Sequence, residues 1–308
     1  MSLGFSRLCP SFNNVVNDPL LLSFFLQYLS STKLENIFRL WLELSSCKSR
    51  KSNNQEEFDF KSEEKVLSDE ELDKLRKMIS ELAVNNVTTI YFRYLSPEAK
   101  LAVDLNAELL SHTLLRIIEN PNNILALEPC FRFAESKLRL SLFPGFLKSE
   151  LFSQFCSEII INDQLTLNDV LFEESLLVFF VEFLAGDPTS TLLTFLLAVN
   201  AYRKEFHELM LKQDHHETIE ERYGQLLHDA TTICAKYLSP ASDDFMGLTL
   251  EQYRDVLDSA CSEKEPQINC FDDLYKLIFK TVEKNILPSF FHSAPFERYR
   301  GNFMKKSG

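Results

Sequence analysis

Two stretches of the chain share one pattern of apolar positions. Residues 165–206 contain two apolar segments separated by Gly186-Asp187-Pro188, where glycine frees the backbone and proline cannot continue a helix. The pattern predicts a helix on each side of this break. Residues 17–44 show the same order, with Asn17-Asp18-Pro19 before the first apolar run and a polar break before the second. An apolar helix pair that occurs twice indicates two copies of one domain.

Later segments repeat in the same order. Tyr-Leu-Ser-Pro occurs at 94–97 and again at 237–240, so these segments lie 143 residues apart (94 to 237). A Cys-Phe pair at 130–131 corresponds to one at 270–271, and the segment around Phe146 corresponds to that around Phe290. Phe25 and Phe180 lie 155 residues apart, which indicates an insertion of about 12 residues in the first copy.

The repeat predicts the domain boundaries. We predict an N-terminal arm over 1–16 that is loosely held, a first domain over 17–162, a second over 163–303 and a tail over 304–308. The first domain contains a polar insertion, residues 48–71, which we expect to be exposed. A helix resumes at Ser68, whose spacing to Glu71 fits a capping box.

Composition agrees with a helical protein. The chain has 308 residues, about the length of two domains, with 27 Phe and only 7 Gly. Few glycines with many Leu, Phe and Glu favour helices over sheets with many turns, so we predict an all-α fold of two tandem helical bundles.

Charge and cysteine usage exclude several classes of protein. A net charge of −13 disfavours nucleic-acid binding and adsorption to anionic membranes. The seven cysteines contain no C-x-x-C pair, which favours reduced thiols. The longest uncharged apolar run, Leu176 to Val181, is too short to span a bilayer, and the N-terminus lacks the apolar core of a signal peptide. We therefore expect a soluble, cytoplasmic protein without a transmembrane segment.

Each half resembles the RGS domain, the helical module of regulators of G-protein signalling. The resemblance depends on four motifs in order: the end of the apolar pair, Tyr-Leu, Cys-Phe and Phe-hydrophobic-x-Ser. In this sequence they are Leu40-Trp41 and Phe195-Leu196, Tyr94-Leu95 and Tyr237-Leu238, Cys130-Phe131 and Cys270-Phe271-Asp272-Asp273, and Phe146-Leu147-Lys148-Ser149 and Phe290-Phe291-His292-Ser293.

The tandem arrangement, with the first copy split by a polar insertion, is similar to that of A-kinase anchoring proteins. The resemblance covers roughly residues 17–303. It implies the protein kinase A regulatory subunit as a partner and a peripheral location at membranes or mitochondria. In that family the kinase binds a C-terminal amphipathic helix, and residues 300–308 are too short for a helix of several turns. Kinase anchoring thus rests on family resemblance alone.

The resemblance also implies where a Gα subunit would bind. Active RGS domains hold the switch regions of Gα with a Glu-Asn pair, a loop Asn, and an Asp and Arg before the last Phe, and so favour the transition state of GTP hydrolysis by binding. These positions correspond to Glu35, Asn36 and Ile37, Asn122 or Asn123, Ser141 and Gly145 in the first half, and to Thr191, Leu192, Ser262, Asn285 and Ser289 in the second. Most of this polar set is replaced, and each lost buried hydrogen bond costs about 1–3 kcal/mol. We expect little or no GTPase-activating activity.

Other constellations have ordinary structural explanations. Asp214-His215-His216-Glu217 with His207 lacks a second cluster that would complete a metal site, so we expect no metal and no cofactor. Glu173 and Glu174 are expected at a helix start, where carboxylates stabilise the helix. Cys130 and Cys270 are expected in the core, and no nucleophile with a base is recognisable.

We expect a non-enzymatic signalling adaptor or scaffold that docks small GTPases or other signalling proteins. The alternatives are an active GTPase-activating protein for Gα subunits and a purely structural scaffold for trafficking.

Overall fold

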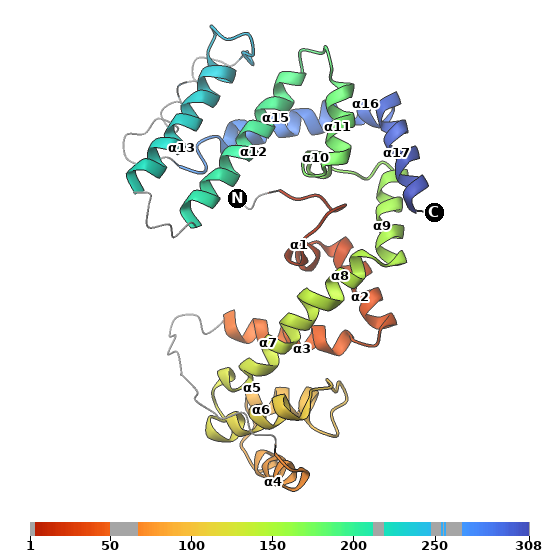
Figure 1. Ribbon diagram of the computed structural model, residues 1–308, viewed down its shortest axis with the longest axis vertical. Coiled ribbons are helices and arrows are strands. Elements are labelled where there is room, and N and C mark those ends of the chain that lie inside the picture. The colour runs from red at the N-terminus through yellow and green to blue at the C-terminus, as the bar shows by residue number, and fades with distance from the viewer. Residues whose placement is uncertain are drawn as a thin grey trace. The chain divides into compact units, whose positions relative to one another are not determined.

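The computed structural model describes residues 4–49, 67–211, 219–247, 254, 256 and 267–307. Its contacts divide the chain into two compact units. We call Val15–Phe155 the first unit, and Met1–Asn14 with Cys156–Gly308 the second unit. Every regular element in these described ranges is a helix (Figure 1), which confirms the predicted all-α fold.

Figure 1 labels the α helices in chain order, and η denotes in the text a short 3₁₀ or π segment. The first half contains α1 (Phe12–Asn17), α2 (Pro19–Ser31), α3 (Glu35–Ser49), α4 (Asp69–Ser80), α5 (Asn86–Ile90), η1 (Tyr91–Leu95), α6 (Ala107–Glu119), η2 (Ile124–Leu127), α7 (Glu128–Lys137), η3 (Leu138–Leu142) and α8 (Phe143–Leu147). They are followed by α9 (Glu150–Ile161), α10 (Leu167–Leu171), α11 (Glu174–Phe183), α12 (Ser190–Leu211), α13 (Ile219–Ile233), η4 (Cys234–Leu238), α15 (Asp272–Asn285), α16 (Leu287–Phe291) and α17 (Ala294–Ser307).

The same aromatic contact connects the early and late helices of each unit. In the first unit the rings of Phe25 on α2 and Phe146 on α8 lie 5.2 Å apart at 64°. In the second unit the rings of Phe180 on α11 and Phe290 on α16 lie 4.9 Å apart at 70°. All four side chains are completely buried. Such edge-to-face pairs contribute about 0.5–1.5 kcal/mol beyond the burial of their area.

The serine of each Phe-hydrophobic-x-Ser motif begins the next helix. Ser149 precedes α9 and its hydroxyl accepts a hydrogen bond from the Phe152 amide at 3.3 Å. Ser293 precedes α17 and accepts one from the Phe296 amide, also at 3.3 Å. The motif therefore combines a core aromatic ring with a helix cap, since a serine hydroxyl satisfies an amide that the helix leaves unpaired.

The turns between paired helices use a left-handed residue in both units. After α11 the residue is Gly186, with φ of 82°. After α2 it is Lys33, with φ of 60°, and the Leu34 amide donates to the Leu29 carbonyl at 3.0 Å in a Schellman turn. Glycine adopts this conformation freely, whereas a lysine pays about 1–2 kcal/mol for it. The predicted break at Gly186 is confirmed.

Two features of the first half bear on other expectations. The capping box from Ser68 to Glu71 is present at the start of α4. Residues 50–66 of the predicted insertion lie outside the described residues. The boundaries 17–162 and 163–303 stay predictions, while the contacts divide the chain between Phe155 and Cys156.

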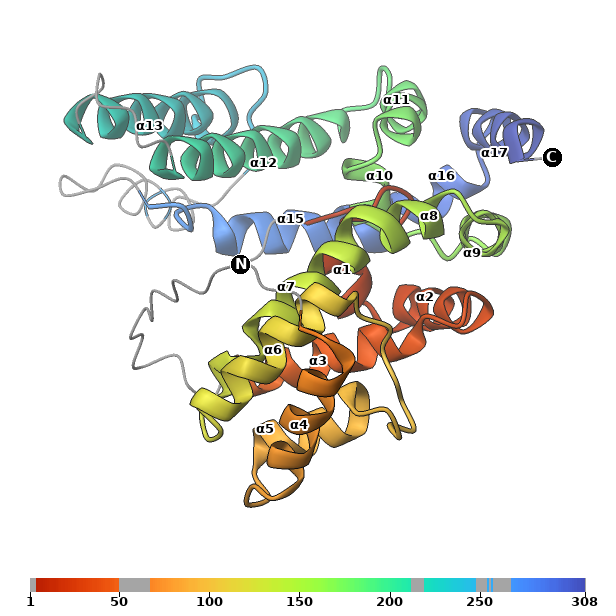
Figure 2. The ribbon, with the colours of Figure 1, turned by 60° about the horizontal axis from the view of Figure 1, so that its bottom comes forward.

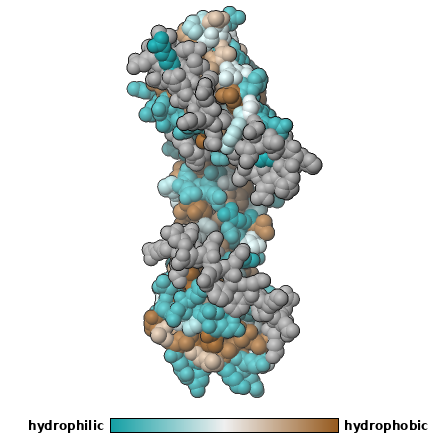
Figure 3. All heavy atoms as spheres, turned by 90° about the vertical axis from the view of Figure 1, so that its left-hand side faces the viewer, coloured by the Kyte–Doolittle hydropathy of each residue, from teal (hydrophilic) through white to brown (hydrophobic). Residues whose placement is uncertain are grey.

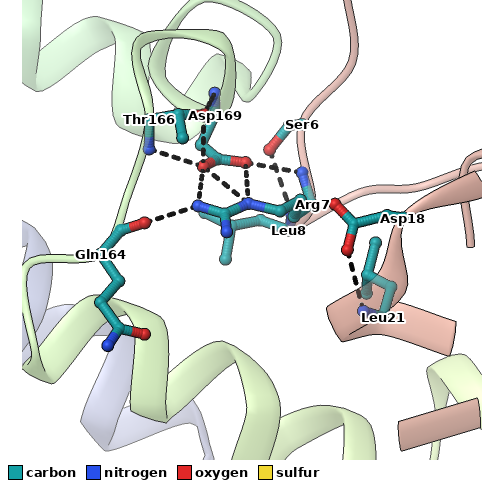
Figure 4. A network of polar contacts seen from close by, with 8 residues as sticks. All are labelled: Ser6, Arg7, Leu8, Asp18, Leu21, Gln164, Thr166 and Asp169. Atoms are coloured by element: carbon teal, nitrogen blue, oxygen red, sulfur yellow. Dashed lines mark hydrogen bonds and ion pairs between the residues drawn. The ribbon is translucent and has the colours of Figure 1, made fainter. Parts of the chain in front are cut away.

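The described part of the N-terminal arm, from residue 4, is held against the second unit, which differs from the expectation of a loose segment. Ser6 and Phe12 are buried. The guanidinium of Arg7 lies 2.5 Å from the carboxylate of Asp169, and the Arg7 amide donates to the same carboxylate at 2.7 Å (Figure 4). The arm has no helical periodicity up to residue 11, so the sequence pattern gave no sign of this contact.

Asp169 belongs to the capping box at the start of α10. Its carboxylate accepts hydrogen bonds from the amide and the hydroxyl of Thr166, both at 2.8 Å, and it is completely buried. Arg7 also donates to the Gln164 carbonyl at 2.6 Å (Figure 4). A buried carboxylate needs such partners, because an unpaired charge in the interior is strongly destabilising.

We expect Arg7→Gln to lower the free energy of unfolding of the second unit by about 3–5 kcal/mol, because it leaves the Asp169 carboxylate buried without its cation. Urea unfolding measures the change. The matched control is Arg298→Gln, which removes the half-exposed ion pair with Glu182 and is expected to cost less than about 1 kcal/mol. Equal small losses in both variants would contradict the anchoring role of Arg7.

Candidate partner-binding surface

The start of α3 carries two of the predicted site residues. Glu35 accepts hydrogen bonds from Arg39 Nε at 3.0 Å and from its Nη2 at 2.5 Å. Asn36 Nδ2 donates to the Ala102 carbonyl at 3.2 Å. This bond places the loop over residues 96–105 beside the start of α3. Ile37, which the sequence aligned with the same pair, is buried and cannot reach a partner.

A backbone hydrogen bond fixes that loop on η1, and the equivalent bond fixes the corresponding loop on η4. The Val103 amide donates to the Tyr94 carbonyl at 2.9 Å, and in the second unit the Met246 amide donates to the Tyr237 carbonyl at 3.1 Å. Both pairs are separated by nine residues, so the loop after Tyr-Leu-Ser-Pro folds alike in the two copies. Asp104 follows Val103 and is exposed. We call Glu35, Asn36, Ala102 and Asp104 the α3 surface.

Gly145 lies at the same end of the first unit. An ideal Cβ on Gly145 would lie 2.4 Å from the Tyr28 hydroxyl, and Tyr28 is in the last turn of α2, just before the turn into α3. In the second unit Ser289 corresponds to Gly145 and Phe183 corresponds to Tyr28. Phe183 lacks the hydroxyl group that Tyr28 carries. Gly145 therefore leaves room for Tyr28. Ser141, one turn earlier, is exposed.

An open depression adjoins the α3 surface. It is lined by Arg39, Leu42, Glu43, Ser46, Arg93, Tyr94 and Leu101. Arg93 Nη1 lies 2.7 Å from a Glu43 carboxylate oxygen. Burial raises the pKa of Tyr94 to about 12, so its hydroxyl stays protonated at neutral pH. The lining combines hydrogen-bonding groups with the apolar side chains of Leu42 and Leu101, a mixture that suits recognition of a protein surface.

Asn122 and Asn123 lie elsewhere in the first unit. Asn122 Oδ1 accepts a hydrogen bond from Asn85 Nδ2 at 3.0 Å, at the start of α5. Asn123 caps η2 by accepting from the Leu125 amide at 3.1 Å. The loop beside Asn36 follows the other end of the continuous α5–η1 segment, whose ten residues span roughly 15 Å. The structure does not bring these asparagines to the α3 surface.

The second unit presents a different set. Thr191 lies in the first turn of α12, and Asn285 ends α15 and is exposed. The two helices run in opposite directions (Figure 2), so both residues lie toward one end of the unit. Ser289 on α16 is exposed near Asn285, while Ser262 lies outside the described residues.

The opposite end of the α12–α15 pair contains a part-buried ion pair. Arg203 Nη2 lies 2.7 Å from Asp272 Oδ1, and the guanidinium stacks 4.2 Å from the centre of the Tyr275 ring. The Tyr202 hydroxyl donates to the Gln267 carbonyl at 3.1 Å. These contacts hold the start of α15 on α12 and leave no free group for chemistry.

Thiols and carboxylates of the described residues have structural positions. Cys130 and Cys270 are buried, as expected, and burial raises the pKa of Cys130 to about 12 and that of Cys270 to about 11. Such thiols are poor nucleophiles. Glu173 and Glu174 lie at the start of α11, as expected. The described ranges contain no cluster of metal-binding side chains, and the predicted segment 214–217 lies outside them.

A model of the regulator of G protein signaling domain matches residues 11–155 and 166–299. The two matches cover most of the chain. The chain belongs to the RGS family. Its two RGS domains follow one another in tandem, as the repeat indicated, and the loop that the structure places beside Asn36 lies within the first of them.

Curated relatives match about three quarters of the chain. The chain is 26% identical over 231 residues to "A-kinase anchor protein 10, mitochondrial" of Homo sapiens, and 26% identical over 232 residues to the Mus musculus protein of that name. The matches cover 73% and 74% of this chain. They cover 33% of each relative, so the chain spans about a third of the length of these proteins. No solved structure matches the chain.

Sequence reasoning did not predict that the loop over residues 96–105 lies beside Asn36. The family pattern places the loop amide before Cys130, whereas the residue that Asn36 contacts, Ala102, belongs to the loop after Tyr94-Leu95-Ser96-Pro97. The shared Tyr-Leu-Ser-Pro motif was the available signal. None of the helices that the structure describes has the length and hydropathy of a bilayer-spanning helix.

We expect Gly145→Ser to lower the free energy of unfolding of the first unit by about 1–3 kcal/mol, because the new Cβ clashes with the Tyr28 hydroxyl. Adding Tyr28→Phe recreates the pair that the second unit has and should recover most of the loss. Urea unfolding of the single and double variants measures the coupling. A double variant as unstable as Gly145→Ser would show that the hydroxyl is not the cause.

We expect Asn36→Ala to accelerate hydrogen exchange of the Leu101 and Val103 amides about five-fold. The bond from Asn36 to Ala102 holds the residue between them, and losing one such bond costs about 1 kcal/mol. Amide exchange followed by NMR measures both rates. Asn123→Ala, which removes the cap of η2, is the control and should leave these two rates unchanged.

Proposed function

We propose that the chain is a non-catalytic signalling scaffold whose first RGS domain docks a protein partner on the α3 surface. The proposal is supported most by the residues found at the positions with which active RGS domains bind Gα. Ile37 is buried, Gly145 accommodates Tyr28, and Thr191 and Leu192 replace the polar pair in the second domain. A surface that keeps its position but only part of the polar set suits docking more than catalysis by transition-state binding.

The exposed apolar side chains of the first unit support a protein partner. Leu42 of the depression is 39% exposed and Phe92 on the neighbouring η1 is 46% exposed. Figure 3 also shows hydrophobic side chains at the surface of the first unit. Apolar residues mixed with Arg39 and Arg93 are typical of the centre of a protein interface.

The partner class that we propose is a small GTPase or another signalling protein. The second candidate is GTPase activation on a Gα subunit, and the observation in its favour is that Glu35 and Asn36 remain together at the start of α3. The relatives are named A-kinase anchor proteins, so the protein kinase A regulatory subunit is a third partner to test. Their name also says mitochondrial, and we propose a cytoplasmic or peripheral mitochondrial location, which imaging of a tagged chain tests.

The experiment is a capture assay with the purified chain. Gα subunits, small GTPases and the regulatory subunit of protein kinase A serve as probes, with each GTPase loaded with GDP, GDP and aluminium fluoride, or a GTP analogue. We expect capture of a GTP-loaded small GTPase with an unchanged single-turnover hydrolysis rate. Capture of Gα in its fluoroaluminate state with faster hydrolysis would replace docking by GTPase activation.

A pair of charge reversals locates the surface. Asp104→Lys is expected to weaken capture at least ten-fold, because it changes the exposed charge beside Asn36. Glu119→Lys is the matched control, since Glu119 is an exposed carboxylate at the end of α6, near the loop of Asn122. Equal capture by both variants would place the docking site elsewhere, and capture in no lane would reject GTPase docking.

A further inference from the structure

Helix α11 of the second unit exposes an apolar stripe that the RGS core does not use. Its inner side buries Leu176 and Phe180. On the other side Val178 is 66% exposed and Val181 is 50% exposed, and Ala185 follows after the last turn. Val178 and Val181 are three residues apart on the helix and therefore lie on one face, and the exposed Ala185 lies in the turn that follows. We call Val178, Val181 and Ala185 the α11 stripe.

The first copy of the domain has polar residues at two of these three positions. With the offset of 155 residues between Phe25 and Phe180, Val178 corresponds to Ser23 and Ala185 to Ser30. Ser23 is exposed and its hydroxyl donates to the Leu20 carbonyl at 2.7 Å. The RGS fold thus has no need for valine at this position. Valine is also a weaker helix former than unbranched residues, so an exposed valine gains nothing locally.

The exposed charges around the stripe are acidic. Glu174 precedes Val178 by one turn, Glu182 follows it by one turn, and Asp187 follows the helix; all three are exposed. Between Lys148 and Arg203 the sequence has eight Asp or Glu and no Lys, Arg or His. Arg298 of α17 pairs with Glu182 and offsets its charge. The first copy has Gln27 in place of Glu182. The acidic residues around the stripe are therefore a feature of the second copy alone.

We propose that the α11 stripe is a docking surface for a basic amphipathic helix of a protein partner. Such a helix places apolar side chains on Val178 and Val181 and lysines or arginines beside Glu174 and Asp187. A second copy of the chain is a poor occupant, because an isologous contact would bring the same carboxylates together. The stripe belongs to the second unit, so this proposal does not depend on the α3 surface of the first.

The test uses a labelled 20-residue peptide with leucines on one helical face and lysines on the other. Fluorescence anisotropy with the purified chain measures its Kd. Val178→Ser with Val181→Ser is expected to weaken binding at least ten-fold. Leu277→Ser is the matched control, since Leu277 is 50% exposed on α15 of the same unit, and it should leave Kd unchanged. The melting temperature confirms that each variant is folded.

Charge is tested in the same assay. A peptide with glutamates in place of the lysines should bind at least ten-fold more weakly, and Glu174→Lys should weaken the lysine peptide and reduce its salt dependence. Equal binding of both peptides, or equal loss in Leu277→Ser, would overturn the proposal. A dimer in sedimentation that Val178→Ser with Val181→Ser abolishes would assign the stripe to a second copy, and selective binding to anionic vesicles would assign it to a membrane; either result overturns it.

Discussion

Each RGS domain of this chain depends on one contact between rings that are distant in sequence. The ring of Phe146 contacts that of Phe25, and the ring of Phe290 contacts that of Phe180. These contacts pack the last helices of each bundle on its first pair of helices. Closing loops of this length costs conformational entropy, which the ring contact and the burial around it must offset. The serine three residues after Phe146 and Phe290 then starts the next helix and fixes its direction.

This closure also determines the candidate surface. Because α8 packs on α2, the end of the first unit gathers the start of α3, the loop over residues 96–105 and the segment around Gly145. The Tyr28 hydroxyl occupies the space beside Gly145 that a side chain at residue 145 would need. The absence of a polar side chain there is thus a consequence of packing in the core. A function assigned to that position from family pattern alone would overlook this constraint.

The sequence predicted what local patterns determine. Helix pairs, the break at Gly186, the capping box at Ser68 and the tandem repeat follow from periodicity and from residues with strong local preferences. The pairing of Arg7 with Asp169 could not be predicted, because the two residues are 162 positions apart and no periodicity marks the arm. The loop beside Asn36 was also missed. Its position follows from backbone bonds to Tyr94 and not from the identity of its own residues.

Comparison of the two copies separates core from surface. Core positions change in compensating pairs: Tyr28 with Gly145 in one copy becomes Phe183 with Ser289 in the other, and the ring of Tyr28 or Phe183 keeps the same tilt of 53° to the Phe of the motif. An outer position can change without such compensation, as Ser23 becomes Val178, which is 66% exposed. The fold requires the paired residues of the core to change together, but it places no such requirement on the residues of the outer surface. The two RGS domains can therefore keep one architecture while presenting different outer faces.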